Sequence, residues 1–204
     1  MRTSRLEAFS DGVLAIIITI MVLELRAPDE PTLRALGHSA TGFLTYLLSF
    51  VYVGIYWNNH HHMFHVVESV SGSVLWANLH LLFWLSLFPF STGWMDESGF
   101  ERTPTMVYGV NLLLAAVAYY VLQLSIFRRP GGQGLRRALG RDLKGKASPL
   151  VYAAGLAACF ANPVLGVAVY TVVALMWLVP DRRVERFVLA GASTGTDHDD
   201  GRAR

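Results

Sequence analysis

Ionisable side chains inside otherwise apolar segments are the residues of this chain whose chemistry most needs an explanation. Asp11 stands just before an apolar run that extends from Val13 to Leu23. A charged side chain costs about 2.5–3.5 kcal/mol at the centre of a membrane span and less near the ends. Glu7 can form a capping box with Ser4 at the start of a helix. Asp11 has no such role, so we expect it to have a polar partner on a neighbouring helix or a water-filled space.

A second group is the run His60-His61-His62, with His65 close behind. Imidazole binds zinc, copper and nickel, and His61 and His65 share a helix face because they are four residues apart. No carboxylate lies on that face within a turn, so we predict no metal site. Interfacial histidines are the simpler interpretation, and a pH sensor that titrates near pH 6.5 stays open.

The elements that carry these residues are apolar. Of 204 residues, 53% are apolar and only 16% are charged, whereas soluble domains have about a quarter charged residues. A single cysteine, Cys159, excludes an intramolecular disulfide and a thiolate metal cluster. We find no nucleophile–base pattern, glycine-rich phosphate loop or nucleic-acid motif. The sequence therefore predicts a membrane protein that is not an enzyme, requires no cofactor and binds no nucleic acid.

Apolar runs long enough to cross a bilayer, about 20 residues each, predict an all-α integral membrane domain over residues 1–190 and a disordered cytoplasmic tail over 191–204. Residues that favour helix starts precede prolines at Thr103-Pro104, Ser148-Pro149 and Asn162-Pro163. The six predicted spans are 5–26, 36–63, 73–94, 104–127, 149–161 and 163–180. The fifth is short, so one bent helix over 149–180, with five crossings in total, is the alternative.

The distribution of positive charge favours six crossings. With six, both termini and the 128–147 loop lie on one side, and most arginines and both lysines lie there too. Five crossings would place Arg182, Arg183 and Arg186 outside, against the preference of positive residues for the cytoplasmic side. We therefore predict a multi-pass protein of the cell membrane with both termini in the cytoplasm.

One stripe of the first predicted helix is defined by helical spacing: Gly12, Ile16, Thr19, Ile20 and Leu23. Asp11 lies well away from this stripe, so it points back into the protein if the stripe faces a central axis. Every face of this helix is apolar. On periodicity alone, packing against lipid or the protein core is therefore the simpler explanation of the stripe.

The segment from Arg5 to Val13, followed by Ala15-Ile16, Thr19 and Leu23-Glu24, fits the pattern R-x-x-x-F-S-D-G, A-I-x-x-T, L-E. This pattern resembles the first-helix signature of the bacterial relatives of transmembrane protein 175, the endosomal and lysosomal potassium channel. Further similarity lies at Tyr56-Trp57 and Leu87-Phe88-Pro89-Phe90. The resemblance implies a homotetramer of six-helix subunits, in which the first helix of each lines a central pore without a P-loop filter.

The resemblance also assigns roles to residues. It implies a hydrophobic constriction at Ile16, Ile20 and Leu23, with Gly12 and Thr19 lining the pore. Glu24, Asp29 and Glu30 would concentrate cations at the outer mouth, although a solvated loop explains them equally well. The motif residues that tie the first helix to its neighbours are Arg5, Phe9, Ser10 and Asp11. We expect Asp11 to accept a hydrogen bond within a buried network from one of five groups: Trp57, Asn58, His61, His62 or Asn78.

The resulting prediction is a potassium-permeable cation channel whose partners are other copies of itself, the lipid bilayer and monovalent cations. No segment like T-V-G-Y-G is present, so selectivity cannot come from a carbonyl filter. Two alternatives stay open. One is a proton-coupled secondary transporter that uses Asp11 and the histidines, and the other is a metal-binding membrane protein centred on His60 to His65.

Overall fold

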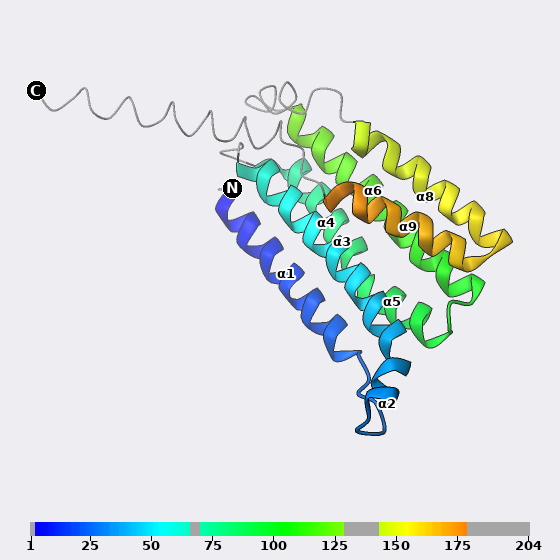
Figure 1. Cartoon of the computed structure of the whole chain (residues 1–204). Helices are drawn as coiled ribbons and strands as arrows, with labels where there is room; N and C mark the ends of the chain where they lie inside the picture. The colour runs from blue at the N-terminus through cyan, green and yellow to red at the C-terminus, as the bar shows by residue number, and fades with distance from the viewer. Residues whose placement is uncertain (1–2, 66–69, 129–142, 179–204) are drawn as a thin grey trace, which may run out of the picture.

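The computed structural model describes residues 3–65, 70–128 and 143–178, and every regular element in these ranges is a helix. Long helices lie side by side and form an elongated bundle (Figure 1). The predicted all-α fold class is therefore confirmed for the described residues. The predicted boundary at residue 190 and the predicted tail lie outside them.

Four segments are long and apolar enough to cross a membrane. They are α1 (Thr3–Leu23), most of α3 (Ala40–His65), the pair α4 (Gly72–Ser86) and α5 (Phe88–Glu97), and α6 (Arg102–Phe127). Each lies within a few residues of one of the first four predicted spans. Two shorter apolar helices, α8 (Leu143–Ala161) and α9 (Pro163–Leu178), occupy the positions of the fifth and sixth.

Several predicted helix starts differ from the structure. Ser4 lies inside α1, so it forms no capping box with Glu7. The second predicted span divides into the short helix α2 (Leu33–His38), which Thr32 caps, and α3. The helix predicted to start at Pro104 begins at Arg102 instead.

The predicted start of the fifth span at Pro149 is wrong, because α8 begins six residues earlier, at Leu143. Contacts with α9 hold this early part in place: Trp177 Nε1 donates to Ser148 Oγ at 2.8 Å, and Lys144 Nζ donates to the Met176 carbonyl at 3.1 Å. Tertiary contacts thus keep a proline inside a helix that it would otherwise end. At 1.5 Å per residue, the 19 residues of α8 extend about 28 Å.

The reversal at Asn162-Pro163 is confirmed. Asn162 Oδ1 accepts a hydrogen bond from the Val164 amide at 2.9 Å, and α9 begins at Pro163. The two helices of this hairpin approach closely because Gly166 faces Cys159: a Cβ at position 166 would lie 2.1 Å from the Cys159 sulfur.

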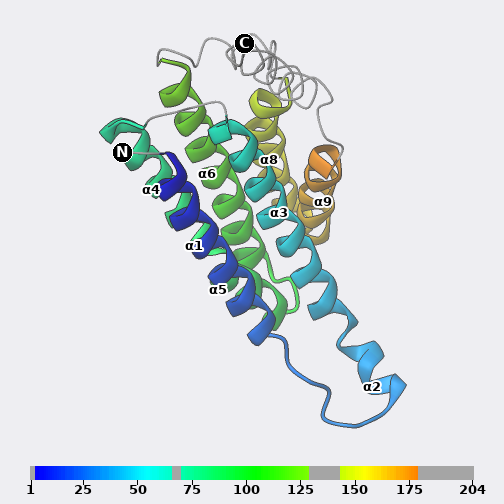
Figure 2. The same cartoon turned by 90° about the vertical axis from the view of Figure 1, so that its left-hand side faces the viewer.

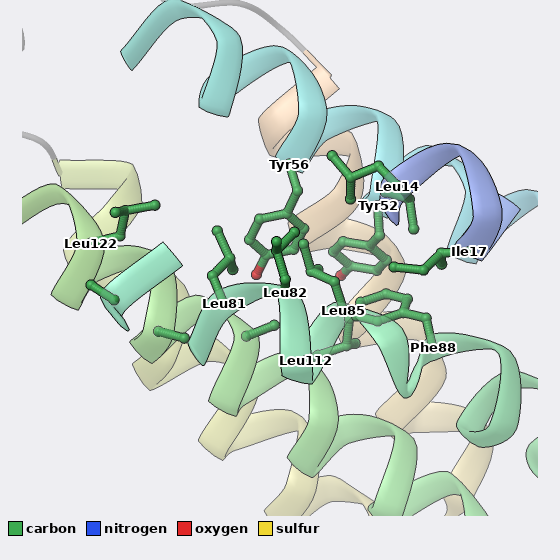
Figure 3. Packing of buried hydrophobic residues seen from close by; sticks show 14 of the residues in the cluster. Leu14, Ile17, Tyr52, Tyr56, Leu81, Leu82, Leu85, Phe88, Leu112 and Leu122 are labelled. Carbon is green, nitrogen blue, oxygen red and sulfur yellow. The ribbon is translucent and has the colours of Figure 1, made fainter. Parts of the chain in front are cut away.

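The core of the bundle is filled with apolar side chains from several helices. Figure 3 shows Leu14 and Ile17 of α1 beside Tyr52 and Phe88, in a cluster that also contains Tyr56, Leu81, Leu82, Leu85, Leu112 and Leu122. Among the described residues, helix α6 packs against α4, α5, α8 and α9, while α1 packs mainly against α3, α4 and α5. Helix α1 therefore lies at the edge of the bundle, with α3 and α4 on its two sides (Figure 2).

Candidate pore-lining face of α1

Helix α1 has one face that belongs to the core of the bundle. The buried residues of this face follow helical spacing and are Thr3, Leu6, Ser10, Leu14, Ile17 and Met21. They lie against α3, α4 and α5. Burial of this face fixes how α1 is rotated about its own axis, and so decides which residues point away from the bundle.

The residues that point away are those of the predicted stripe. Ile16 is 60% exposed, Ile20 44% and Leu23 78%, and Gly12 and Thr19 are exposed beside them. These fractions exclude packing in the core of the same subunit as the explanation of the stripe. The stripe therefore faces a bilayer, a pore or another protein. The constriction at Ile16, Ile20 and Leu23 stays a prediction.

Thr19 brings a polar group into this apolar face. Its hydroxyl donates to the Ala15 carbonyl at 2.5 Å, one turn earlier in the same helix. This bond uses the hydroxyl proton, so the oxygen presents its lone pairs. An exposed oxygen with free acceptor capacity can contribute to the coordination of a cation.

The motif serine anchors α1 to the rest of the bundle. Ser10 Oγ donates to the Leu6 carbonyl at 2.9 Å and accepts from Asn78 Nδ2 at 3.0 Å. The Asn78 carbonyl oxygen lies 2.8 Å from His60 Nε2. Since that oxygen can only accept, His60 donates and carries its proton on Nε2. All three side chains are buried.

His60 is a residue of this network that the sequence analysis did not select. The histidine run directed attention to His61 and His62, which lie on other sides of α3. Helical spacing was the available signal, because His60 continues the series Tyr52, Val53, Tyr56 and Phe64, all of which are buried.

Asp11 lies outside the buried network, contrary to the expectation that it is buried. Its carboxylate is exposed and accepts a hydrogen bond from Trp57 Nε1 at 3.0 Å. The structure thus selects Trp57 from the five groups considered as partners. The His61 ring stacks on Trp57 and lies 4.0 Å from the Glu7 carboxylate. Trp57 and His61 therefore hold α1 to α3 on the side opposite to Asn78.

The remaining motif residues are not brought into this network. Arg5 and Asn58 are exposed, and Phe9 is half-exposed on the same outward face as Gly12. His62 lies beside His61, with ring centroids 5.8 Å apart. Among the described residues, no group of three or more histidine, cysteine, aspartate or glutamate side chains could hold a metal ion. The side chain of His65 lies outside those residues.

At the other end of α1, Glu24 approaches α5. A Cβ at Gly93 would lie 3.1 Å from Glu24 Oε2, and Arg26 forms an exposed ion pair with Glu97. Partial burial and the Glu97 carboxylate raise the pKa of Glu24 above its ordinary value of 4.5. Asp29 and Glu30 are exposed in the segment that follows. Glu24, Asp96 and Glu97 line one wide cavity, and the sequence analysis missed the last two.

Known proteins resemble the chain over these same elements. The family described as "Endosomal/lysosomal potassium channel TMEM175" matches residues 5–89. A protein of Chryseobacterium sp. (strain P1-3) named potassium channel HX13_20290 is 50% identical over 187 residues, which are 91% of this chain and 97% of that protein. The chain belongs to the TMEM175 family. The family resemblance inferred from the first-helix motif is therefore confirmed.

A second TMEM175 relative, potassium channel B446_29190 of Streptomyces collinus, is 33% identical over 59% of this chain and 62% of its own length. A crystal structure described as a lysosomal potassium-selective channel TMEM175 homolog from Chamaesiphon minutus aligns with a TM-score of 0.71 and 28% identity. It covers 87% of this chain and 96% of that one. The TMEM175 family is one of ion channels, so the prediction that this chain is not an enzyme and requires no cofactor is confirmed.

The segment that matches the TMEM175 family begins at Arg5 and ends at Pro89. It contains the outward stripe of α1, the buried Ser10, Asn78 and His60, and the bond between Trp57 and Asp11. The part of the chain that the family model matches is thus the part that sets the rotation of α1.

Proposed function

We propose that this chain is the subunit of a homotetrameric potassium channel in which α1 of each subunit lines a central pore. One observation carries the proposal: the stripe with Ile16, Ile20 and Leu23 points away from the core of its own subunit. Membership of the TMEM175 family and relatives named potassium channels support it.

Packing inside the subunit favours a pore between subunits. Large side chains fill the middle of the bundle, and Leu81, Phe88, Leu112 and Leu122 have no exposed surface. An ion needs a hydrated or polar path, and a core packed in this way offers none. Four copies of the α1 stripe around an axis would provide a path that the single subunit lacks.

The constriction would act by dewetting. Rings of Ile16, Ile20 and Leu23 exclude water when they are narrow, and a cation cannot give up its hydration there. Opening requires the four helices to rotate or spread. Thr19, between the rings of Ile16 and Ile20 along the helix, would offer hydroxyl oxygens to an ion that has lost part of its water.

Acidic groups at the far end of α1 would raise the local concentration of cations. Glu24 lies next to the last residue of α1, and Asp96 and Glu97 of α5 line the same cavity. Repeated around a four-fold axis, these carboxylates give the entrance a negative potential. Asp29 and Glu30 would contribute at longer range from the exposed segment.

The chain would cross the membrane of a bacterial cell six times, by α1, α3, the pair α4 and α5, α6, α8 and α9. An even number of crossings places both termini on one side, and the basic residues assign that side to the cytoplasm. The end of the bundle with Glu24 and Glu97 is then the outer end.

Recording from purified protein in planar bilayers tests the proposal. We expect unitary currents that reverse near the potassium equilibrium potential. Saturating, proton-coupled flux without resolvable conductance would contradict a channel and indicate a transporter. Zinc that is retained in stoichiometric amount and lost when His61 and His62 are replaced would indicate the metal-binding alternative.

A permeant proton is a second candidate, favoured by a specific observation. The relative from Bos taurus, 37% identical over 39% of this chain and 19% of its own length, is named "Endosomal/lysosomal proton channel TMEM175". In this chain Asp11 is an exposed carboxylate on α1, bonded to Trp57. A current that follows the pH gradient and is lost in Asp11→Asn would establish proton permeation.

A further inference from the structure

Two exposed stripes flank α1, one on each neighbouring helix. On α3 the stripe consists of the exposed Phe43, Leu47, Phe50, Trp57 and His61 together with the half-buried Gly54, with steps that alternate between four and three residues. On the other side of α1 it is Trp76, His80 and Phe83 of α4, continued by Phe90 and Trp94 of α5. Such spacing is typical of helices that pack along their whole length at a small crossing angle.

The stripe on α4 is strongly exposed and contains an imidazole. Trp76 is 75% exposed and Phe83 55%. His80 Nε2 accepts a hydrogen bond from Trp84 Nε1 at 3.0 Å, so the His80 proton is on Nδ1. An exposed imidazole within a membrane span is costly against lipid. A protein surface is therefore a better occupant of this face than acyl chains.

The subunit itself gives the register between the two stripes. Helix α3 is antiparallel to α4 and α5, because His60 bonds Asn78 near one end and Gly42 approaches Asp96 near the other. Gly54 is six residues before His60, and Phe83 is five residues after Asn78. At 1.5 Å per residue both lie about 8–9 Å from the His60–Asn78 bond. Gly54 and Phe83 are thus at the same depth.

Rotation about an axis normal to the membrane leaves depth unchanged, so each residue meets a residue of its own depth on the next subunit. The same register pairs Trp57 with His80 and His61 with Trp76. It also places the bulky Phe83 opposite a position without a side chain, and a Cβ at Gly54 would have no atom of its own subunit within 4 Å. The two stripes match in depth, and at Gly54 and Phe83 they are also complementary in size.

We propose that the partner of these faces is a second copy of the chain: α3 of one subunit packs against α4 and α5 of the next, and Phe83 occupies the space at Gly54. This head-to-tail interface rests on the proposed tetramer, since it brings α1 of every subunit to the axis. The interface proposal adds to the tetramer which helices of neighbouring subunits meet and in which register they pack.

Disulfide cross-linking tests the interface. In a Cys159→Ala background, Gly54→Cys combined with Phe83→Cys is expected to give a ladder of covalent dimers, trimers and tetramers on mild oxidation. A disulfide requires the two Cα atoms to be about 4.4–6.8 Å apart. The matched control is Val117→Cys with Phe83→Cys. Val117 is exposed on α6, close in depth to Gly54 because Tyr119 contacts Tyr56. No ladder is expected for the control pair.

Light scattering in detergent, performed on the same samples, separates the two proposals. A tetramer that forms the ladder with Val117 but not with Gly54 would overturn this interface and leave the tetramer standing. A monomer would overturn both proposals.

A second pair of variants tests the fit without cysteines. Gly54→Leu fills the space for Phe83 and is expected to abolish the tetramer while the subunit stays helical, because Gly54 has free space in the subunit. Adding Phe83→Ala should restore the tetramer. Unchanged assembly of Gly54→Leu would contradict the proposal.

Discussion

Two neighbouring residues of α1 differ sharply in exposure: Ile16 is 60% exposed and Ile17 only 3%. Both are isoleucines in one apolar helix, so hydrophobicity does not separate their roles. Their exposure differs because the face of α1 that contains Ser10, Leu14 and Met21 is buried. Ile17 lies on that face, and Ile16 points outward. The rotation of α1 about its own axis leads to predictions for single substitutions.

Ile16→Asn is expected to increase current, because an amide in the proposed constriction would let water enter it when it is closed. If the barrier falls by about 1.4 kcal/mol, the current rises about tenfold. Unitary recordings with macroscopic currents at equal protein density measure the effect. Val22→Asn is the control, since Val22 is also exposed but lies away from the stripe. An equal increase in both variants would contradict Ile16 as the barrier.

Ser10→Ala is expected to destabilise the subunit by about 1–3 kcal/mol, because it leaves the buried Asn78 amide without the acceptor that it has at 3.0 Å. Unfolding in detergent, followed by helical circular dichroism, measures the loss. Ser4→Ala, on an exposed position of the same helix, should leave the stability close to that of the wild type. Equal stability of the two variants would show that the network does not anchor α1.

Acidification of the outer solution is expected to reduce the cation current, because it neutralises Glu24. Since the pKa of Glu24 is raised by partial burial and by Glu97, the carboxyl becomes neutral at a higher pH than an isolated glutamate as the solution is acidified. Its negative charge at the proposed entrance is then lost. Current–pH curves for Glu24→Gln should lack this component, whereas Glu101→Gln, at an exposed residue of the same end, should retain it.

At the scale of elements, the closeness of α8 and α9 depends on glycine more than on apolar side chains. Gly166 lies against Cys159 and against the carbonyl of Gly155, whose oxygen would be 3.1 Å from an added Cβ. Backbone atoms cannot move aside as a flexible side chain can. The hairpin therefore tolerates little growth at this position.

Gly166→Ala is expected to lower the stability of the chain, whereas Gly72→Ala is not. Alanine favours a helix by about 0.5–1 kcal/mol over glycine, and a Cβ at Gly72 meets nothing within 4 Å, so Gly72→Ala should be neutral or stabilising. Gly166→Ala should destabilise by about 1–3 kcal/mol through overpacking. Thermal midpoints in detergent measure both changes. A stabilised Gly166→Ala variant would mean that the hairpin relaxes freely.

At the scale of the whole molecule, the proposed pore belongs to no single subunit. Co-expression of wild-type and Ile16→Asn chains is therefore expected to give channels with conductance or open probability between those of the two pure forms, because each channel contains a mixture of rings. Single-channel recordings resolve these intermediate levels. Two populations only, each like one pure form, would indicate that every subunit contains its own conduction path.

The sequence by itself determined the class of the protein and most of its helices. Apolar length located the long helices, because bilayer thickness imposes a minimum number of apolar residues on any crossing helix. Of the three proline signals, only Asn162-Pro163 marks the start of a helix. The contiguous motif from Arg5 to Val13 determined the family. Helical spacing also put Ile16, Ile20 and Leu23 on one stripe, since this requires only a regular turn.

Only the tertiary structure decided which way that stripe points. Every face of α1 is apolar, so periodicity gives no inside or outside, and burial against α3, α4 and α5 makes the choice. The tertiary structure also decided the hydrogen-bond partners of Asp11 and His60. Their partners, Trp57 and Asn78, come from helices far along the chain, and the pairing depends on how those helices are placed and rotated. Sequence spacing constrains neighbours within a helix, whereas contacts between helices follow from packing of the whole bundle.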